Sequence, residues 1–129
     1  MNNQIRILLA DDHTVMRSGL RLLLERQPNL TVVAEAADGK EAVALAAQEH
    51  PDVVIMDIAM PNLNGIQATA QMVKKNPQIG VIILSMFSDE TYLTRALSAG
   101  AKGYLLKESA DADITKTLLE DYKIGRAHV

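Results

Sequence analysis

Acidic residues stand at the ends of two apolar stretches, where their carboxylates could bind a cation or act as nucleophiles. Asp11 and Asp12 follow the mainly apolar residues 5–10, and Asp57 ends the wholly apolar run 53–56. The second run is short and rich in β-branched side chains, which is typical of a strand buried on both faces. Because parallel strands direct their carboxyl ends to one edge of a sheet, these acids are expected to share a ligand-binding edge.

Two further polar residues follow apolar runs in the same way and complete a set of groups suited to phosphoryl transfer. Ser85 comes after residues 81–84, and Lys107 comes after residues 103–106. A hydroxyl and an ammonium group can stabilise charge on a transferring phosphoryl group while a carboxylate such as Asp57 attacks it. The sequence therefore indicates transfer of a phosphoryl group to Asp57.

Alternating apolar runs and amphipathic stretches predict the elements that position these residues. Strict alternation with short connections favours an α/β fold, a doubly wound five-stranded parallel sheet with five helices on its two faces. The strand order 2-1-3-4-5 would place strands one and three side by side at the switch point. We expect strands over 5–10, 30–36, 53–56, 81–84 and 103–106, and helices over about 14–27, 39–49, 65–75, 89–99 and 111–122.

The spacing of apolar residues predicts which side of each helix faces the sheet. In the first helix Leu20 falls on the inner side and Arg17 on the side that faces water. In the fourth helix Leu93, Ala96 and Leu97 are expected to point inward.

The strand order brings three carboxylates into one crevice. Neighbouring strands lie about 4.8 Å apart, so Asp11, Asp12 and Asp57 would be close, and Lys107, roughly 10 Å away by backbone, could reach Asp57. At about 5 Å and an effective dielectric of about 20, each pair of carboxylates repels by roughly 3 kcal/mol. One lysine cannot neutralise this charge, so we expect Mg²⁺, a hard cation that takes oxygen ligands and bridges to phosphate.

The bulk composition is that of a soluble globular domain and limits the function classes. The 129 residues are 48% hydrophobic and 22% charged, which suits one ordinary folded domain. The absence of cysteine excludes disulfides and thiolate metal sites and agrees with a reducing, cytoplasmic location. With a net charge of −3, no basic cluster and no long apolar run, the chain is expected to bind neither nucleic acid nor membrane by itself.

Taken together, these residues resemble the receiver domain of bacterial two-component response regulators, over about residues 5–122. Within that family, Asp-Asp-His at 11–13, Arg-x-Gly-Leu at 17–20 and the ending at 100–107 are similar to the NarL/FixJ-type branch. The implied fold is flavodoxin-like. The resemblance is carried by Asp11-Asp12, Asp57, Met60-Pro61 with Gly65, Ser85, and Tyr104 with Lys107.

The resemblance implies a role for each acidic residue. Asp57 would be the phosphate acceptor. Asp11 and Asp12 would hold Mg²⁺, with Asp57 and the backbone carbonyl of Ala59 as further ligands.

The resemblance also implies a switch and a set of partners. Ser85 and Lys107 would assist the transfer, and Ser85 with Tyr104 would form a switch pair that reshapes the surface of the fourth helix and fifth strand. The implied partners are a sensor histidine kinase, a second copy in a homodimer formed on phosphorylation, and DNA, reached only through a C-terminal helix-turn-helix domain absent from this chain. On this hypothesis the chain is a signalling phosphoacceptor, not an enzyme.

Three further features of the sequence bear on this hypothesis. Ala59 and Phe87 offer no polar side chain near the acceptor, which predicts slow self-dephosphorylation. His13 is assigned to the start of the first helix, and a role as a ligand or donor is the less favoured alternative. Residues 123–129 lack an amphipathic period and correspond to the translation of a common sequencing adapter. We therefore expect a receiver domain over 1–122, then a non-native tail in place of a missing effector domain.

Two other functions are compatible with parts of the pattern. A phosphatase or phosphotransferase of the haloacid dehalogenase type also phosphorylates an aspartate after a buried strand, but its nucleophile follows the first strand in an Asp-x-Asp sequence. A receiver that docks a partner without being phosphorylated is a further hypothesis, against which the complete acidic set argues.

Overall fold

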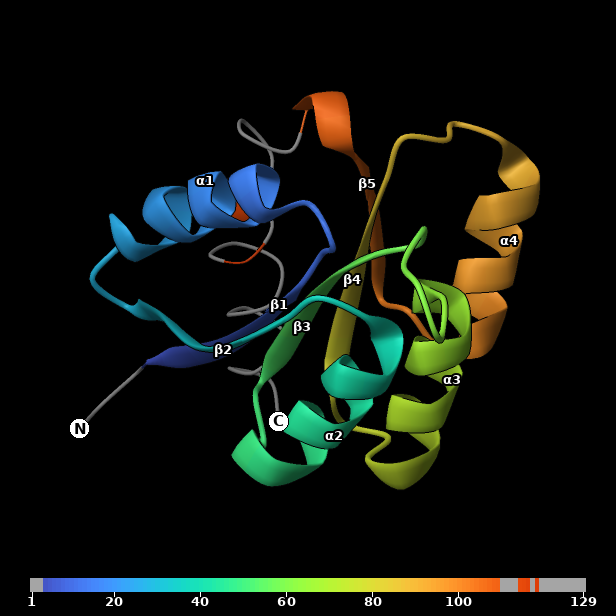
Figure 1. Cartoon of the computed structure of the whole chain (residues 1–129), viewed down its shortest axis with the longest axis horizontal. Coiled ribbons are helices and arrows are strands. Elements are labelled where there is room, and N and C mark those ends of the chain that lie inside the picture. Colours follow the sequence, from blue (N-terminus) through green and yellow to red (C-terminus); the bar gives the residue numbers. More distant parts are fainter. Residues whose placement is uncertain (1–3, 110–113, 117, 119–129) are drawn as a thin grey trace.

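Five parallel strands form a sheet that separates two layers of helices (Figure 1). The computed structural model describes residues 4–109, 114–116 and 118. The strand order is β2-β1-β3-β4-β5, which confirms the predicted topology. The elements are β1 (Ile5–Ala10), α1 (Thr14–Glu25), β2 (Leu30–Ala36), α2 (Gly39–Glu49), β3 (Val53–Asp57), α3 (Gly65–Lys75), β4 (Gly80–Ser85), α4 (Glu90–Ala99), β5 (Gly103–Leu106) and the 3-10 helix η1 (Lys107–Ser109).

The end of the chain is described only in part. Of the helix predicted over 111–122, residues 114–116 are helical, and its bounds lie outside the described residues. The predicted tail over 123–129 also lies outside them.

Alternate side chains of the strands fill two separate apolar cores. Leu8, Val54 and Ile83 belong to the core that α2, α3 and α4 cover. Ile7 and Ile55 belong to the core on the other face, which α1 covers. Because the central strands are apolar on both faces, their polar chemistry is confined to the residues at their ends.

The helix ends follow local chemistry. The side chain of Asp38 accepts a hydrogen bond from the Glu41 backbone and starts α2, and Asn64 starts α3 with a capping box. Helix α1 ends at Glu25 rather than at the predicted Gln27, because Pro28 disfavours helical backbone in the residue before it. Among the described residues, no helix combines the length and apolar character that crossing a bilayer requires.

The prediction that Leu93 and Leu97 of α4 point inward is wrong. Leu93 is 36% exposed and Leu97 is 51% exposed, whereas Ala96 is fully buried as predicted. Tyr92 and Ala99 pack against the core instead, so the buried stripe runs through Tyr92, Ala96 and Ala99. Small alanines on this stripe let α4 approach the sheet closely, and the leucines remain on the outer side.

Gly65 lies too close to the end of β3 for a larger residue. A Cβ there would lie 2.0 Å from the backbone oxygen of Asp57, whereas a Cβ at Gly19 in α1 would meet nothing within 4 Å. We expect Gly65→Ala to lower the free energy of unfolding by about 2–3 kcal/mol. The matched control Gly19→Ala should raise it by about 0.5–1 kcal/mol through helix propensity. Urea denaturation measures both, and equal effects would contradict this packing.

Candidate functional site

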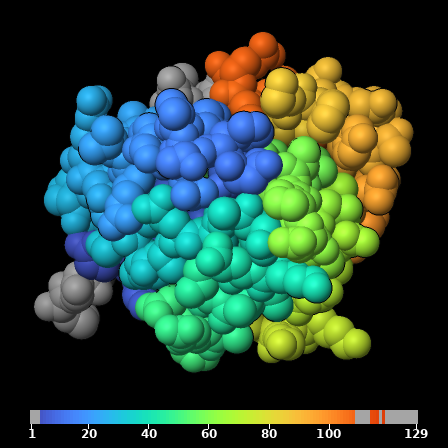
Figure 2. Space-filling model, in the orientation of Figure 1, coloured from blue at the N-terminus to red at the C-terminus, as the bar shows by residue number. Residues whose placement is uncertain are grey.

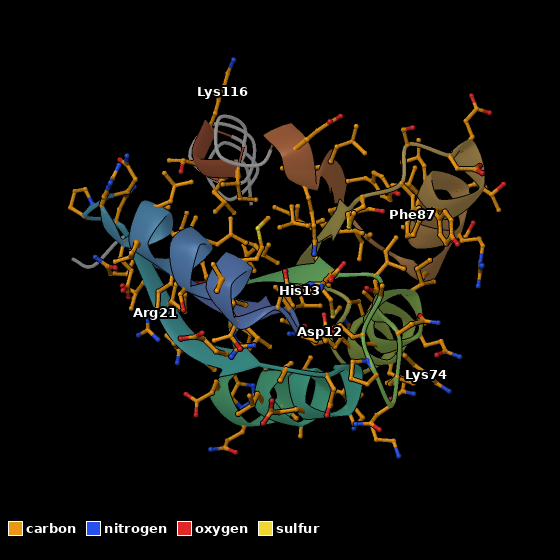
Figure 3. The ribbon with its side chains drawn as sticks, turned by 45° about the horizontal axis from the view of Figure 1, so that its top comes forward. Asp12, His13, Arg21, Lys74, Phe87 and Lys116 are labelled. Carbon is orange, nitrogen blue, oxygen red and sulfur yellow. The ribbon has the colours of Figure 1, made fainter. Side chains whose placement is uncertain are left out.

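Three carboxylates meet at the carboxyl edge of β1 and β3, as the strand order predicts. One ligand atom from each of Asp11, Asp12, Asp57 and His13 can be chosen so that all lie within 4.8 Å of one another. Asp11 and Asp57 are buried, with 3% and 4% of their surface exposed, while Asp12 is exposed. Figure 3 shows Asp12 and His13 next to each other near the centre of the view. We refer to Asp11, Asp12 and Asp57 as the acidic cluster.

Lys107 supplies one ammonium group to the two buried carboxylates. Its Nζ lies 2.9 Å from Asp57 Oδ2, to which it donates a hydrogen bond, and 3.3 Å from Asp11 Oδ2. Burial alone would lower the pKa of Lys107, but the hydrogen bond and charge of Asp57, with a contribution from Asp11, raise it. Lys107 therefore stays charged. Its hydrogen bond to Asp57 confirms the predicted contact between the two side chains.

The surroundings of Asp57 disfavour its ionised form. Burial raises the pKa of Asp57 above its usual range, and the charge of Asp11 adds to this, whereas Lys107 acts in the opposite direction. The pKa values of Asp57 and Lys107 thus both rise, that of Asp57 mainly because of its burial and that of Lys107 because it is attracted by two carboxylates. The site keeps an excess of negative charge.

The donors of the acidic cluster fit a hard divalent cation. Asp11 Oδ2 is buried and accepts no hydrogen bond, although Lys107 Nζ lies within ion-pair distance. Among the described residues, Lys107 is the one cation near this oxygen and is shared with Asp57, so the two buried carboxylates keep negative charge that a metal ion could offset. Together with Asp12 and Asp57, Asp11 could hold Mg²⁺ through oxygen ligands. The backbone carbonyl of Ala59 remains a predicted ligand.

Ser85 and Tyr104 are joined through the backbone of one residue between β4 and α4. The buried Ser85 Oγ accepts a hydrogen bond of 2.9 Å from the Phe87 N–H, and the Tyr104 hydroxyl donates one of 2.7 Å to the Phe87 carbonyl. The Phe87 ring stacks on Tyr92 of α4 with its centroid 4.6 Å away. Figure 3 labels Phe87 beside this helix. A shift of Ser85 can therefore reach both Tyr104 and α4.

A cavity of about 490 Å³ opens beside the acidic cluster. The start of α1, the β4–α4 loop and η1 gather around it at the top of the molecule in Figure 2. It gives access to Ser85 and Lys107 from outside. Its lining consists of His13, Met16, Ser85, Met86, Ser88, Leu106, Lys107 and Glu108.

Two residues of the site region have positions that the sequence did not predict. His13 is the N-cap residue of α1, but its side chain makes no cap hydrogen bond and lies against the acidic cluster instead. Arg17 does not face water: its side chain is 17% exposed and donates to Glu35 on β2 and to the backbone carbonyl of Asp11. Only the proximity of both residues to the acidic pair in the sequence could have indicated these contacts.

Arg17 fixes the acidic loop to the neighbouring strand. Burial would raise the pKa of Glu35, but the hydrogen bonds and charges of Arg21 and Arg17 outweigh it and hold the pKa below its usual value. Glu35 is therefore ionised and binds both arginines. This ion-pair network holds α1, β2 and the carbonyl of Asp11 together.

The sequence is similar to a family of signalling domains. The family model described as the response regulator receiver domain matches residues 7–119. The transcriptional regulatory protein DegU of Brevibacillus brevis is 43% identical over 122 residues, which cover 95% of this chain and 50% of DegU. The oxygen regulatory protein NreC of Staphylococcus epidermidis is 43% identical over 126 residues, covering 97% of this chain and 57% of NreC. The chain thus spans about half the length of these curated relatives.

Solved structures agree with this similarity. A LuxR-family two-component response regulator from Aurantimonas sp. superposes with a TM-score of 0.88 at 38% identity, covering 95% of this chain and 86% of that chain. The signal receiver domain of the response regulator NarL from Mycobacterium tuberculosis gives 0.86 at 33% identity, covering 94% and 98%. The similarity agrees with the branch expected from the sequence.

The raised pKa of Asp57 predicts a pH-dependent effect of removing its charge. The folded protein holds the Asp57 proton more tightly than the unfolded chain, so the stability from this group is lost as pH rises through its folded pKa. We expect Asp57→Asn to raise the free energy of unfolding at neutral pH by on the order of 1 kcal/mol. The gain should shrink toward acidic pH, where Asp57 of the unsubstituted protein is neutral, as the asparagine of the variant is at every pH.

Chemical denaturation across this pH range measures the difference. Asp89→Asn is the matched control, because Asp89 is the exposed N-cap residue of α4 and asparagine can keep the cap. A gain at Asp57 that does not vary with pH would contradict the assignment.

Proposed function

The chain belongs to the response regulator receiver domain family, with relatives among LuxR-family regulators, and we propose that it carries its signal as a phosphoryl group on Asp57. A receiver domain is a signalling module that a histidine kinase phosphorylates, and it is not an enzyme in the ordinary sense. The alternative of a dehalogenase-type phosphatase has no support, because the candidate nucleophile ends β3 and the acidic pair follows β1.

The position of Asp57 is the observation that carries this proposal. It is a buried carboxylate whose pKa is raised, and it is hydrogen-bonded to Lys107. Such a group has little water around it and is a competent nucleophile when its charge is balanced locally. The adjacent cavity gives a donor access to Lys107 and Ser85, which lie next to where the phosphoryl group would be.

In the proposed transfer, a carboxylate oxygen of Asp57 forms a bond to phosphorus while the P–N bond of the kinase phosphohistidine breaks. The electron pair of that bond stays on the imidazole nitrogen, which takes up a proton. Lys107 offsets charge on the phosphoryl oxygens from the position it now holds against Asp57. Ser85 donates its hydroxyl proton to one of them, which requires its Oγ to turn from the Phe87 N–H.

Mg²⁺ is the proposed cofactor of this step. Asp11, Asp12, Asp57 and the Ala59 carbonyl would hold it, and it would supply positive charge against the developing phosphoryl charge. The buried Asp11 Oδ2 without a hydrogen bond supports this assignment. Arg17 contributes by keeping the Asp11 backbone in place.

The proposed output follows from the Ser85 side of the site. When Ser85 turns toward the phosphoryl group, the loop that carries Phe87 loses a hydrogen bond to it and can shift relative to Tyr104 and Tyr92. This would change the outer surface of α4 and β5, where a second copy could bind to form a homodimer. DegU is named a transcriptional regulatory protein. The proposed output is therefore regulation of transcription through a C-terminal DNA-binding domain.

Phosphorylation of Asp57 can be tested with acetyl phosphate as a small-molecule donor. We expect the unsubstituted chain to take up label only when Mg²⁺ is present and Asp57→Asn to take up none. Asp38→Asn is the matched control, because Asp38 caps α2 and asparagine can replace it there. Intact-mass spectrometry measures the uptake. Labelling of Asp57→Asn at the rate of the control would refute Asp57 as the acceptor.

The surroundings of Asp57 also predict a long-lived phosphorylated form. Ala59 is exposed beside the acceptor and Phe87 stacks on Tyr92, so neither side chain can hold an attacking water. We expect a half-life of minutes or longer, and Ala59→Asn, which adds a polar side chain, should shorten it several-fold.

Loss of label from the purified phosphorylated protein measures this half-life. Ala44→Asn makes the same change on the exposed side of α2, away from the acidic cluster, and should leave the half-life unchanged. A half-life of seconds in the unsubstituted chain would show that water attack needs neither side chain.

A further inference from the structure

The imidazole of His13 lies against the acidic cluster and has no part in the proposed phosphoryl transfer. Its Nδ1 lies 3.1 Å from Asp11 Oδ1, 3.3 Å from Asp12 Oδ1 and 3.9 Å from Asp57 Oδ2. The ring is 60% exposed, so little packing holds it in this position. A nitrogen donor is thus placed among three carboxylates.

These separations match those between ligands of one metal ion. With bonds of about 2.0–2.1 Å, neighbouring ligand atoms lie about 3.0 Å apart in an octahedron and about 3.3 Å apart in a tetrahedron. The distances from Nδ1 to Asp11 and Asp12 fall at these values, and the distance to Asp57 is longer by an amount that a small rotation of an exposed ring can correct.

A second observation points to a cation at this place. Asp11 Oδ2 is buried without a hydrogen bond, and the side chain of His13 is not engaged in capping α1. The helix therefore does not require an imidazole at this position. In the described part of the chain, Asp11 Oδ2 has only the ammonium of Lys107 near it, which Asp57 shares. The ring nitrogen of His13 lies beside Asp11 Oδ1.

We propose that His13 Nδ1 is a metal ligand that adapts the acidic cluster to borderline transition cations such as Ni²⁺, Zn²⁺ and Cu²⁺. Imidazole suits these ions, whereas Mg²⁺ takes oxygen ligands and gains little from a nitrogen. The inference rests on the cation site of the proposed function. Because both kinds of ion would share Asp11, Asp12 and Asp57, they bind in competition.

The other role open to His13 is a hydrogen bond from its ring N–H to Asp11. In that role His13 would only position the carboxylate, and its loss would weaken Mg²⁺ and Ni²⁺ to a similar extent. The ratio of the two affinities therefore separates a ligand from a positioning residue.

Calorimetric titration with Ni²⁺ and with Mg²⁺ tests the assignment. The sequence contains three histidines, so a background with His50→Asn and His128→Gln leaves His13 alone. Asparagine tolerates the left-handed backbone of His50, whose φ is 50°. Adding His13→Ala to this background should weaken Ni²⁺ at least about tenfold, while Mg²⁺ changes by less than about twofold.

Electron paramagnetic resonance of bound Cu²⁺ gives an independent readout. We expect nitrogen splitting in the background protein and its loss with His13→Ala, and excess Mg²⁺ should displace the copper. Unchanged Ni²⁺ affinity, or an equal fall for both ions, would overturn the inference while the proposed function stands. If the background protein binds no Mg²⁺, the metal site of the proposed function itself fails.

Discussion

Two buried carboxylates that share a single ammonium group set the main constraint on this structure. Asp11 and Asp57 lie within a few ångströms of Lys107 and are removed from water, so their mutual repulsion is strong. The repulsion arises because β1 and β3 are adjacent in the sheet. Lys107, which follows β5 directly and begins η1, offsets part of it. Excess negative charge beside an open cavity makes this place suited to a metal ion, which would in turn offset the charge of a phosphoryl group.

The charged site is connected to the outer surface by few contacts. On one side, Arg17 joins the Asp11 carbonyl to Glu35 on β2. On the other, the backbone of Phe87 links Ser85 to Tyr104, and its ring packs on α4. Each contact joins the sheet edge to a helix or loop, so the proposed phosphorylation of Asp57 would act on these neighbours first.

Most of the fold and the acidic cluster could be predicted from sequence, because both follow from strong local patterns. Buried parallel strands need uninterrupted apolar runs, and polar residues at their ends fall at one edge once the strand order is fixed. The inner face of α4 could not be predicted in this way. Its leucines and alanines have similar spacing, and only packing against the core shows that Tyr92, Ala96 and Ala99 form the buried side.

Side-chain contacts between different helices and strands could not be predicted from the sequence either. The spacing of Arg17 on α1 is that of a residue that faces water. The carboxylate of Glu35 on β2 nevertheless attracts its side chain toward the sheet. His13 stands where a helix cap is expected, and only its position next to Asp11 and Asp12 in the sequence hints that its ring turns to the acidic cluster. Both contacts depend on partners brought near by the tertiary structure.

At Gly65 the chain passes very close to the backbone of Asp57, behind the candidate acceptor. Gly65 donates to the carbonyl of Ile58 and lies against the backbone of Asp57, so the start of α3 and the end of β3 pack backbone to backbone. A charged group added at Asp57 would therefore find less room on the α3 side than on the side of the cavity that Ser85 and Lys107 line.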